Sequence, residues 1–378
     1  MTLYVETDGL TAAEAMVQRA ADDVIAARDH FDQNGKIAWI LDGIINIVED
    51  DNNRIRWSLL AFLNNLGQNA LPAAGEAITD ARNYYARTDR AGAEKIDATM
   101  PGVDVAAESR DVPAPQPGPS NRDMIPLHDV REPRGRLNHV AFDDSAYGLD
   151  YQPKWHDMIS PAAALRTAFY EVTALGAKIG LCDRAYDPYE VVLKPICGDW
   201  AGMARLGSVL NQLEWCLRDV AINLAWTAQG IRSVWTGNAG DAASAYFFKM
   251  AKALDTSAST LDGLGKMYSE AARGAFELAD TIGSLLSGIA DAAIFAAAAG
   301  ATAGGSAATG IGLPLAALAA IGGAVEVNRV VQGMVEIVEY VAKFDTLTST
   351  LKSSMGHFGE VDGEFPVPTL PSVPPVPR

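Results

Sequence analysis

Cysteine and histidine are both scarce in this sequence, and neither is spaced for chemistry. The 5 histidines are scattered, and no pair has the spacing of a helical metal site. The 3 cysteines, Cys182, Cys197 and Cys216, form no C-x-x-C pair, so we interpret them as small buried side chains. A disulfide between Cys182 and Cys197 remains an alternative if the protein works outside the cytoplasm. We therefore expect no metal site and no cofactor.

Catalytic signatures are also missing. The sequence contains neither the G-x-S-x-G of a nucleophile elbow nor the G-x-x-x-x-G-K-[ST] of a phosphate-binding loop. The acidic cluster Glu49–Asn53 lacks the glycine and the distal glutamate of a calcium loop, so it predicts a solvated turn. Most other carboxylates fall on predicted helix surfaces and caps. We expect no catalytic residues and no enzyme, unless the fold brings scattered groups together.

Positive charge is in short supply. The chain has 30 Lys and Arg against 47 Asp and Glu, which gives a net charge of −17. Nucleic-acid binding needs a basic stripe to neutralise phosphates, so nucleic acid is not an expected partner. An anionic membrane surface would repel the chain, which leaves apolar insertion as the only membrane route. The stretch from Met1 to Ala15 carries three carboxylates and does not resemble a secretory signal peptide.

Apolar residues, by contrast, make up 49% of the chain and follow helical spacing. Thr11 and Glu14 form a capping box for a first helix. Its apolar stripe is Ala13, Val17, Ala20, Val24, Ala27 and Phe31. The cleanest stripe predicts a helix of about 35 residues, and its members are Met203, Leu206, Leu210, Leu213, Leu217, Val220, Leu224, Thr227, Ile231 and Val234. A further stripe consists of Phe247, Met250, Leu254, Leu261, Leu264 and Tyr268. Together the last two predict an antiparallel helical hairpin.

Proline marks the interruptions. Prolines cluster between residues 113 and 133 and again between 366 and 377, and they predict an extended linker and an extended tail. We therefore predict an all-α protein whose long antiparallel helical hairpins pack as an elongated helical bundle. The predicted units are a helical domain at 1–98, a linker at 99–159, a hairpin domain at 160–290, an Ala/Gly-rich hairpin at 291–357 and a Pro-rich tail at 358–378.

The Ala/Gly-rich stretch has two interpretations. From Ala292 to Val325 it has no charged residue, so residues 282–325 could insert into a membrane. Its second limb is shorter than the roughly 20 apolar residues that span a bilayer. Alanine and glycine also contribute little transfer energy. We therefore favour close helix packing inside the protein and keep insertion as the alternative.

The predicted bend of the long hairpin carries the first of two short motifs. Trp235-Thr236-Gly237 separates the two apolar stripes. Trp235 can cover the open end of the helix pair, and Gly237 can supply the left-handed backbone that ends the first helix. Asn238 and Asp241 can cap the next helix. Any helical hairpin could use such a turn, so the triplet alone does not identify a function.

The second motif lies in an earlier part of the chain. Two helical stretches, Trp57–Leu66 and Ala73–Ile96, are predicted to meet at a bend near Pro72. Tyr85 and Asp89 fall in the second stretch, four residues apart, and are therefore predicted to share one helix face.

In combination, the two motifs resemble those of type VII (ESX) secretion substrates. Residues 180–290 resemble a long member of the W-x-G (Esx-like) hairpin family, with the bend at Trp235-Thr236-Gly237. Asp187-Pro188 and Gly198-Asp199-Trp200 resemble the lead-in elements of its larger actinobacterial relatives. Residues 1–98 are similar to EspC-like secretion-associated domains, in which a Tyr-x-x-x-Asp pair ends the last helix.

Tyr85 and Asp89 match that pair. By contrast, Tyr268 is followed four residues later by Ala272, so the second hairpin lacks a complete signal of its own. In the family, the W-x-G of one hairpin and the Y-x-x-x-D of its partner lie close together in a four-helix heterodimer. Here both motifs are in one polypeptide, and our hypothesis is that the two hairpins pair within the chain and form a composite export signal without a separate partner.

The resemblance implies a non-enzymatic protein that is secreted or associated with the cell envelope and acts through protein–protein contacts. The expected partners are the type VII secretion machinery and, for the hairpins, either each other within the chain or a separate Esx-like or chaperone subunit. One alternative is a membrane-active effector that inserts the Ala/Gly-rich hairpin. A second is a cytosolic helical scaffold.

Overall fold

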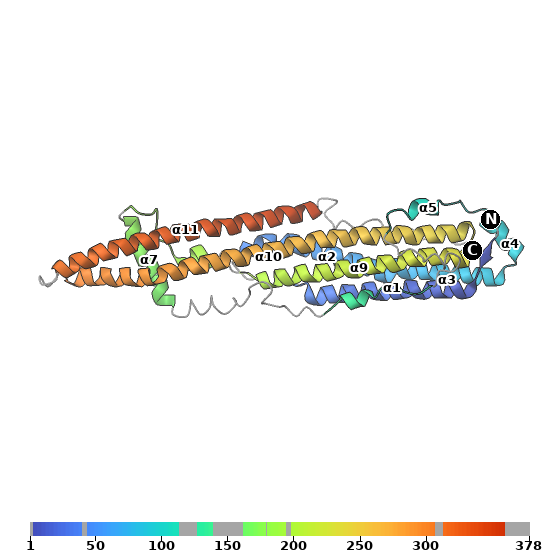
Figure 1. Cartoon of the computed structure of the whole chain (residues 1–378), viewed down its shortest axis with the longest axis horizontal. Coiled ribbons are helices and arrows are strands. Elements are labelled where there is room, and N and C mark those ends of the chain that lie inside the picture. Colours follow the sequence, from blue (N-terminus) through green and yellow to red (C-terminus); the bar gives the residue numbers. More distant parts are fainter. Residues whose placement is uncertain are drawn as a thin grey trace.

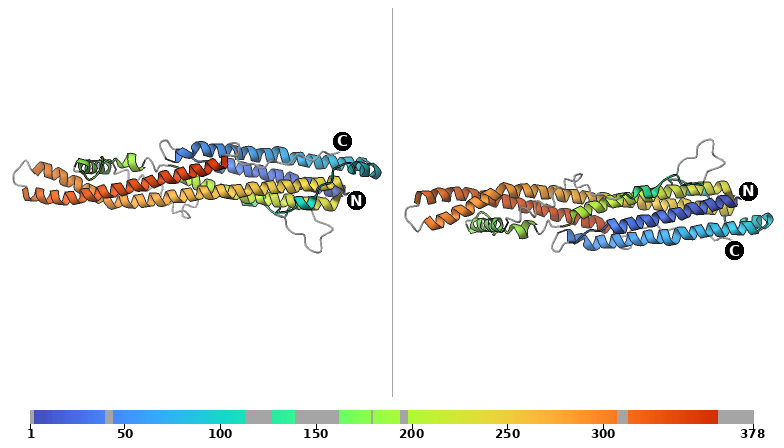
Figure 2. Two further views of the ribbon diagram at one scale, coloured as in Figure 1. Left: turned by 90° about the horizontal axis from the view of Figure 1, so that it is seen from above. Right: turned by 90° about the horizontal axis from the view of Figure 1, so that it is seen from below.

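The chain folds into a narrow bundle of long helices. The computed structural model describes residues 3–39, 44–112, 127–138, 162–178, 180–193, 198–306 and 313–359. In these ranges the regular structure is helical apart from two very short strands. The long helices run side by side along one axis, and the helix at residues 162–178, labelled α7, crosses them (Figures 1 and 2). The predicted all-α fold, with long antiparallel hairpins in an elongated bundle, is confirmed.

The N-terminal part of the bundle is a set of helices packed around α1. Its elements are β1 (Tyr4–Val5), α1 (Thr7–Asn34), η1 (Ile44–Val48), α2 (Glu49–Asn65), η2 (Leu66–Ala70), α3 (Leu71–Arg87), α4 (Arg90–Asp97) and α5 (Val105–Glu108). The bend predicted near Pro72 corresponds to η2, a π-helical turn that joins α2 to α3 without a break. α1 packs against α3 on one side and against a later helix, α9, on the other.

The C-terminal part is dominated by three very long helices. Its elements are η3 (Pro133–Arg136), α7 (Ala162–Lys178), η5 (Tyr189–Leu193), α9 (Trp200–Val234), β2 (Trp235–Thr236), α10 (Asn238–Ser306) and α11 (Leu313–Gly359). α9 has 35 residues, the length that its stripe predicts. α10 has 69 residues and is therefore roughly 100 Å long at 1.5 Å per residue. α9 and α11 both pack along α10 (Figure 1).

The apolar stripes predicted from sequence form the core. Every member of the α1 stripe and of the α9 stripe is buried, and the most exposed of them, Val234, is only 8% exposed. The α10 stripe from Phe247 to Tyr268 is buried as well. α10 then continues without interruption through residues 290 and 291, so the W-x-G hairpin and the hairpin of α10 with α11 share one helix.

The acidic cluster Glu49–Asn53 does not form the predicted turn but opens α2. Glu49, Asp50 and Asp51 occupy its first turn, where carboxylates interact favourably with the helix dipole. Asn52 is buried, and its Oδ1 accepts a hydrogen bond of 2.8 Å from the hydroxyl of Tyr268 in α10. This hydrogen bond links α2 to α10. The polar sequence Glu49–Asn53 does not by itself indicate that Asn52 is buried in such a contact.

The capping box predicted at Thr11 and Glu14 is wrong. α1 begins one turn earlier, and Thr11 Oγ1 donates to the Thr7 carbonyl oxygen within the helix at 3.1 Å. Both predicted capping side chains instead bind Arg82 of α3, whose Nη1 lies 2.9 Å from Thr11 Oγ1 and 2.9 Å from Glu14 Oε2. The pattern that looked like a helix start therefore docks α3 on α1.

Candidate functional site

The Trp235-Thr236-Gly237 turn joins α9 to α10 at one end of the bundle (Figure 1). α9 ends at Val234, and Trp235 and Thr236 are extended. Gly237 has a φ of +114°, the left-handed backbone that the sequence predicts. A Cβ at Gly237 would also lie 2.6 Å from Asp97 Oδ2, so the position excludes other residues for two reasons.

Tyr85 packs directly against Trp235. The two rings meet edge to face, with centroids 5.7 Å apart and an interplanar angle of 75°. Trp235 is only 5% exposed, and Tyr85 is half-buried. The contact thus brings together the two motifs, which are 150 positions apart in the sequence. Such aromatic pairs contribute roughly 0.5–1.5 kcal/mol beyond the apolar area that they bury.

Trp235 belongs to the hydrophobic core, and Tyr85 packs against that core. Burial raises the pKa of the Tyr85 hydroxyl to about 12, and the charge of Asp97 adds to the rise, although the indole of Trp235 opposes it. Tyr84 stacks edge to face on Tyr85 with centroids 5.3 Å apart. A Cβ at Gly240 would lie 2.2 Å from the Trp235 carbonyl oxygen, so α10 passes very close to the tryptophan.

Asp89 is not on the same helix as Tyr85, contrary to the prediction. α3 ends at Arg87, and Thr88 is extended, with φ −100° and ψ 136°. Asp89 is the N-cap of α4, and its Oδ1 accepts a hydrogen bond of 2.8 Å from the Gly92 amide. The break follows from the capping preference of aspartate, which competes with its place inside a helix. Asp89 itself is exposed.

Asp97, the last residue of α4, caps the start of α10. Its two carboxylate oxygens accept hydrogen bonds from the amides of Asn238 at 3.0 Å and Ala239 at 2.9 Å. Asn238 Nδ2 donates in return to the carbonyl oxygens of Asp97 at 3.1 Å and Met100 at 3.0 Å. The predicted capping by Asn238 and Asp241 is therefore wrong. Three hydrogen bonds through Asp97 hold α4 to the turn, and a fourth holds Met100 in the segment that follows α4.

Sequence reasoning missed Asp97 altogether. The residue belongs to neither motif, and its partner amides lie 141 and 142 positions further on. One signal could have pointed to it, because a carboxylate at the C-terminal end of a helix opposes the dipole of its own helix. The position becomes favourable when the carboxylate accepts hydrogen bonds from the N-terminus of another helix, as Asp97 does from α10.

The strand β1 closes the other side of the turn. Tyr4 and Val5 pair antiparallel with Thr236 and Trp235. The Tyr4 amide donates to Thr236 Oγ1 at 2.9 Å, and the Glu6 amide donates to the Val234 carbonyl oxygen at 2.8 Å. Segments from four places in the sequence therefore meet at the turn: β1, the end of α3, the end of α4 and the α9–α10 bend.

Other predicted features fall away from this site. In the described ranges no group of three metal-ligating side chains comes together. Within the same ranges, no helix has the length and apolar character needed to cross a membrane, and the stretch 282–325 falls partly outside them. Cys216 is buried and Cys182 half-buried, while Cys197, the other half of the disulfide considered above, lies outside the described residues.

Comparison with protein-family models, with curated proteins and with solved structures gave no match to this chain.

Proposed function

We propose that this protein is a non-enzymatic cargo of a type VII (ESX) secretion system and acts outside the cytoplasm through protein contacts. Its export signal is composite and is built within one chain. The observation that carries the proposal is the edge-to-face contact of Tyr85 with Trp235, because it joins the Y-x-x-x-D segment to the W-x-G turn. Secretion substrates of this family combine those two motifs from two subunits, and here one polypeptide supplies both.

The residues of the signal have different tasks in this proposal. Trp235 is buried, so it positions the neighbouring segments and does not itself touch the secretion machinery. Gly237 permits the close approach of Asp97, which fixes α4. Asp89 starts α4 and is exposed, so its carboxylate is the group that the machinery contacts. Tyr85 joins the segment that leads to Asp89 to the W-x-G turn through its contact with Trp235.

Fractionation of the producing cell tests the proposal. We expect the full-length protein in culture filtrate or cell envelope when the type VII ATPase is present, and only in the cell lysate when that ATPase is deleted. A cytosolic protein retained in the lysate of both strains controls for cell breakage. Equal amounts outside the cell in both strains would exclude this route, and a protein confined to the lysate of both strains would favour a cytosolic scaffold.

A further inference from the structure

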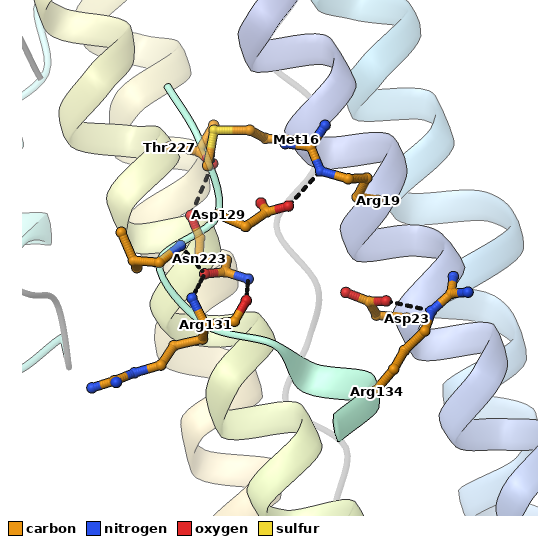
Figure 3. A network of polar contacts seen from close by, with 9 residues as sticks. Met16, Arg19, Asp23, Asp129, Arg131, Arg134, Asn223 and Thr227 are labelled. Atoms are coloured by element: carbon orange, nitrogen blue, oxygen red, sulfur yellow. Dashed lines mark hydrogen bonds and ion pairs between the residues drawn. The ribbon is translucent and has the colours of Figure 1, made fainter. Parts of the chain in front are cut away.

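Residues 127–138, which we call the strap, lie across α1 and α9 (Figure 3). One buried side chain of α9, Asn223, holds the backbone of the strap. Its Oδ1 accepts hydrogen bonds from the amides of Val130 at 3.0 Å and Arg131 at 2.9 Å. Its Nδ2 donates to the Arg131 carbonyl oxygen at 3.1 Å. An extended peptide of any sequence could make these three bonds.

The side chains of the strap add selectivity for arginine. Arg134 Nε lies 2.7 Å from Asp23 Oδ1 of α1, and Arg136 Nε lies 2.7 Å from Asp219 Oδ2 of α9. The carboxylates are well covered, since the side chain of Asp23 is 14% exposed and that of Asp219 only 5%. Carboxylates that are this buried need a charged or hydrogen-bonding partner, so the surface favours arginine at both places.

A third pair runs in the opposite sense. Arg19 of α1 pairs with Asp129 of the strap (Figure 3). Pro133, which lies between these charged contacts in the sequence, is buried, and Leu137, which follows them, packs on the core. Main-chain hydrogen bonds that give affinity, together with side-chain contacts that give specificity, are one means by which proteins bind peptide segments.

We propose that Asp23, Asp219 and Asn223 form a peptide-binding site for a segment that binds Asn223 through its backbone and then presents two arginines, two residues apart, on a 3₁₀ turn, and that the strap, with η3, fills this site in cis and reversibly. The strap contacts both α1 and α9, so its binding helps to hold the N-terminal helices on the W-x-G hairpin. A free peptide of the same chemistry competes with it for the site. The effective concentration of a tethered segment is on the order of millimolar, so competition requires a peptide at a similar concentration.

Cys216 of α9 provides a natural reporter of strap opening. Its side chain is fully buried, and its thiol lies near four charged groups of the site and the strap. Burial raises the pKa of this thiol, the carboxylates of Asp23 and Asp219 raise it further, and the guanidinium groups of Arg134 and Arg136 lower it. Because Cys216 is fully buried, its thiol reacts with an alkylating reagent only when neighbouring segments move away, and the strap, whose two arginines act on this thiol, is one of these segments.

The first test compares the alkylation of Cys216 in three full-length proteins, with peptide mapping by mass spectrometry. Replacing both Arg134 and Arg136 by glutamine removes two ion pairs, and we expect labelling about tenfold faster than in the wild type. R273Q is the control, because Arg273 is an exposed arginine of α10 outside the strap and its Nε lies 3.7 Å from Glu277 of the same helix. Its labelling rate should equal that of the wild type.

The second test adds a synthetic peptide of residues 127–138 at millimolar concentration to the R134Q/R136Q protein. The peptide should slow Cys216 labelling toward the wild-type rate, whereas the same peptide with glutamine at both arginines should not. Circular dichroism checks that the variant keeps its helix content, and R134Q alone serves if the double variant does not fold. Equal labelling of wild type and variant, or equal effects of the two peptides, would overturn the proposal.

Discussion

Replacing Trp235 by alanine should lower the free energy of unfolding by about 3–5 kcal/mol, the range for removal of a large buried aromatic side chain. Trp235 is 5% exposed and fills the space between Tyr85 and the start of α10. The variant loses both the buried apolar area and the ring contact. Urea unfolding followed by far-ultraviolet circular dichroism measures the change.

Trp57→Ala is the matched control for this prediction. Trp57 lies in α2 and is 65% exposed, with the guanidinium of Arg56 at 5.3 Å from its ring centroid. Its loss should cost less than about 1 kcal/mol. Similar losses of stability in the two variants would show that Trp235 does not anchor the turn.

Replacing Asp97 by alanine should lower the free energy of unfolding by about 2–4 kcal/mol, because two amides at the start of α10 lose a charged acceptor. The Asp97 side chain is buried, so water does not readily replace the lost bonds. Amide hydrogen exchange should quicken at Asn238 and Ala239 while the middle of α9 stays protected. The unfolding free energy measures the loss of global stability, and the exchange rates show whether the loss is local to the start of α10.

Two further variants separate the components of this cap. Asp97→Asn keeps one acceptor oxygen and removes the charge, so its loss should lie between those of the wild type and Asp97→Ala. Asp104 caps the short helix α5 from an exposed position, with its Oδ1 accepting from the Ala107 amide at 3.2 Å. Asp104→Ala should cost less than about 1 kcal/mol. If Asp97→Ala cost no more than Asp104→Ala, the tie between α4 and the turn would be minor.

The elements that could be predicted are those in which one local pattern decides the outcome. The stripe from Met203 to Val234 predicted the length and the buried face of α9, because a regular repeat that is apolar at every position except Thr227 defines one face on which the helix can pack. Gly237 was predictable in the same way, since the end of a helix needs a backbone conformation that glycine adopts at little cost.

The features that could not be predicted depend on partners far away in the sequence. Thr11 and Glu14 have the spacing of a capping box, yet Arg82 decides their role. α3 ends before Asp89 because the Asp89 side chain caps α4. The spacing of apolar residues does not show whether an aspartate will continue one helix or cap the next. The hydrogen bonds of Asp97 with the start of α10, and those of Asn223 with the strap, each join residues more than 90 positions apart. No spacing rule finds such pairs.

The most direct measurement for the account is the export of Asp89→Asn from a strain with an active type VII system. Asparagine caps a helix about as well as aspartate, so α4 should keep its start while the exposed carboxylate is lost. Asp80→Asn removes an exposed carboxylate from α3, away from both motifs, and is the matched control. The account predicts that Asp80→Asn is exported like the wild type and that Asp89→Asn falls to the level of a strain without the secretion ATPase. Export of Asp89→Asn at the wild-type level, with normal stability, would contradict it.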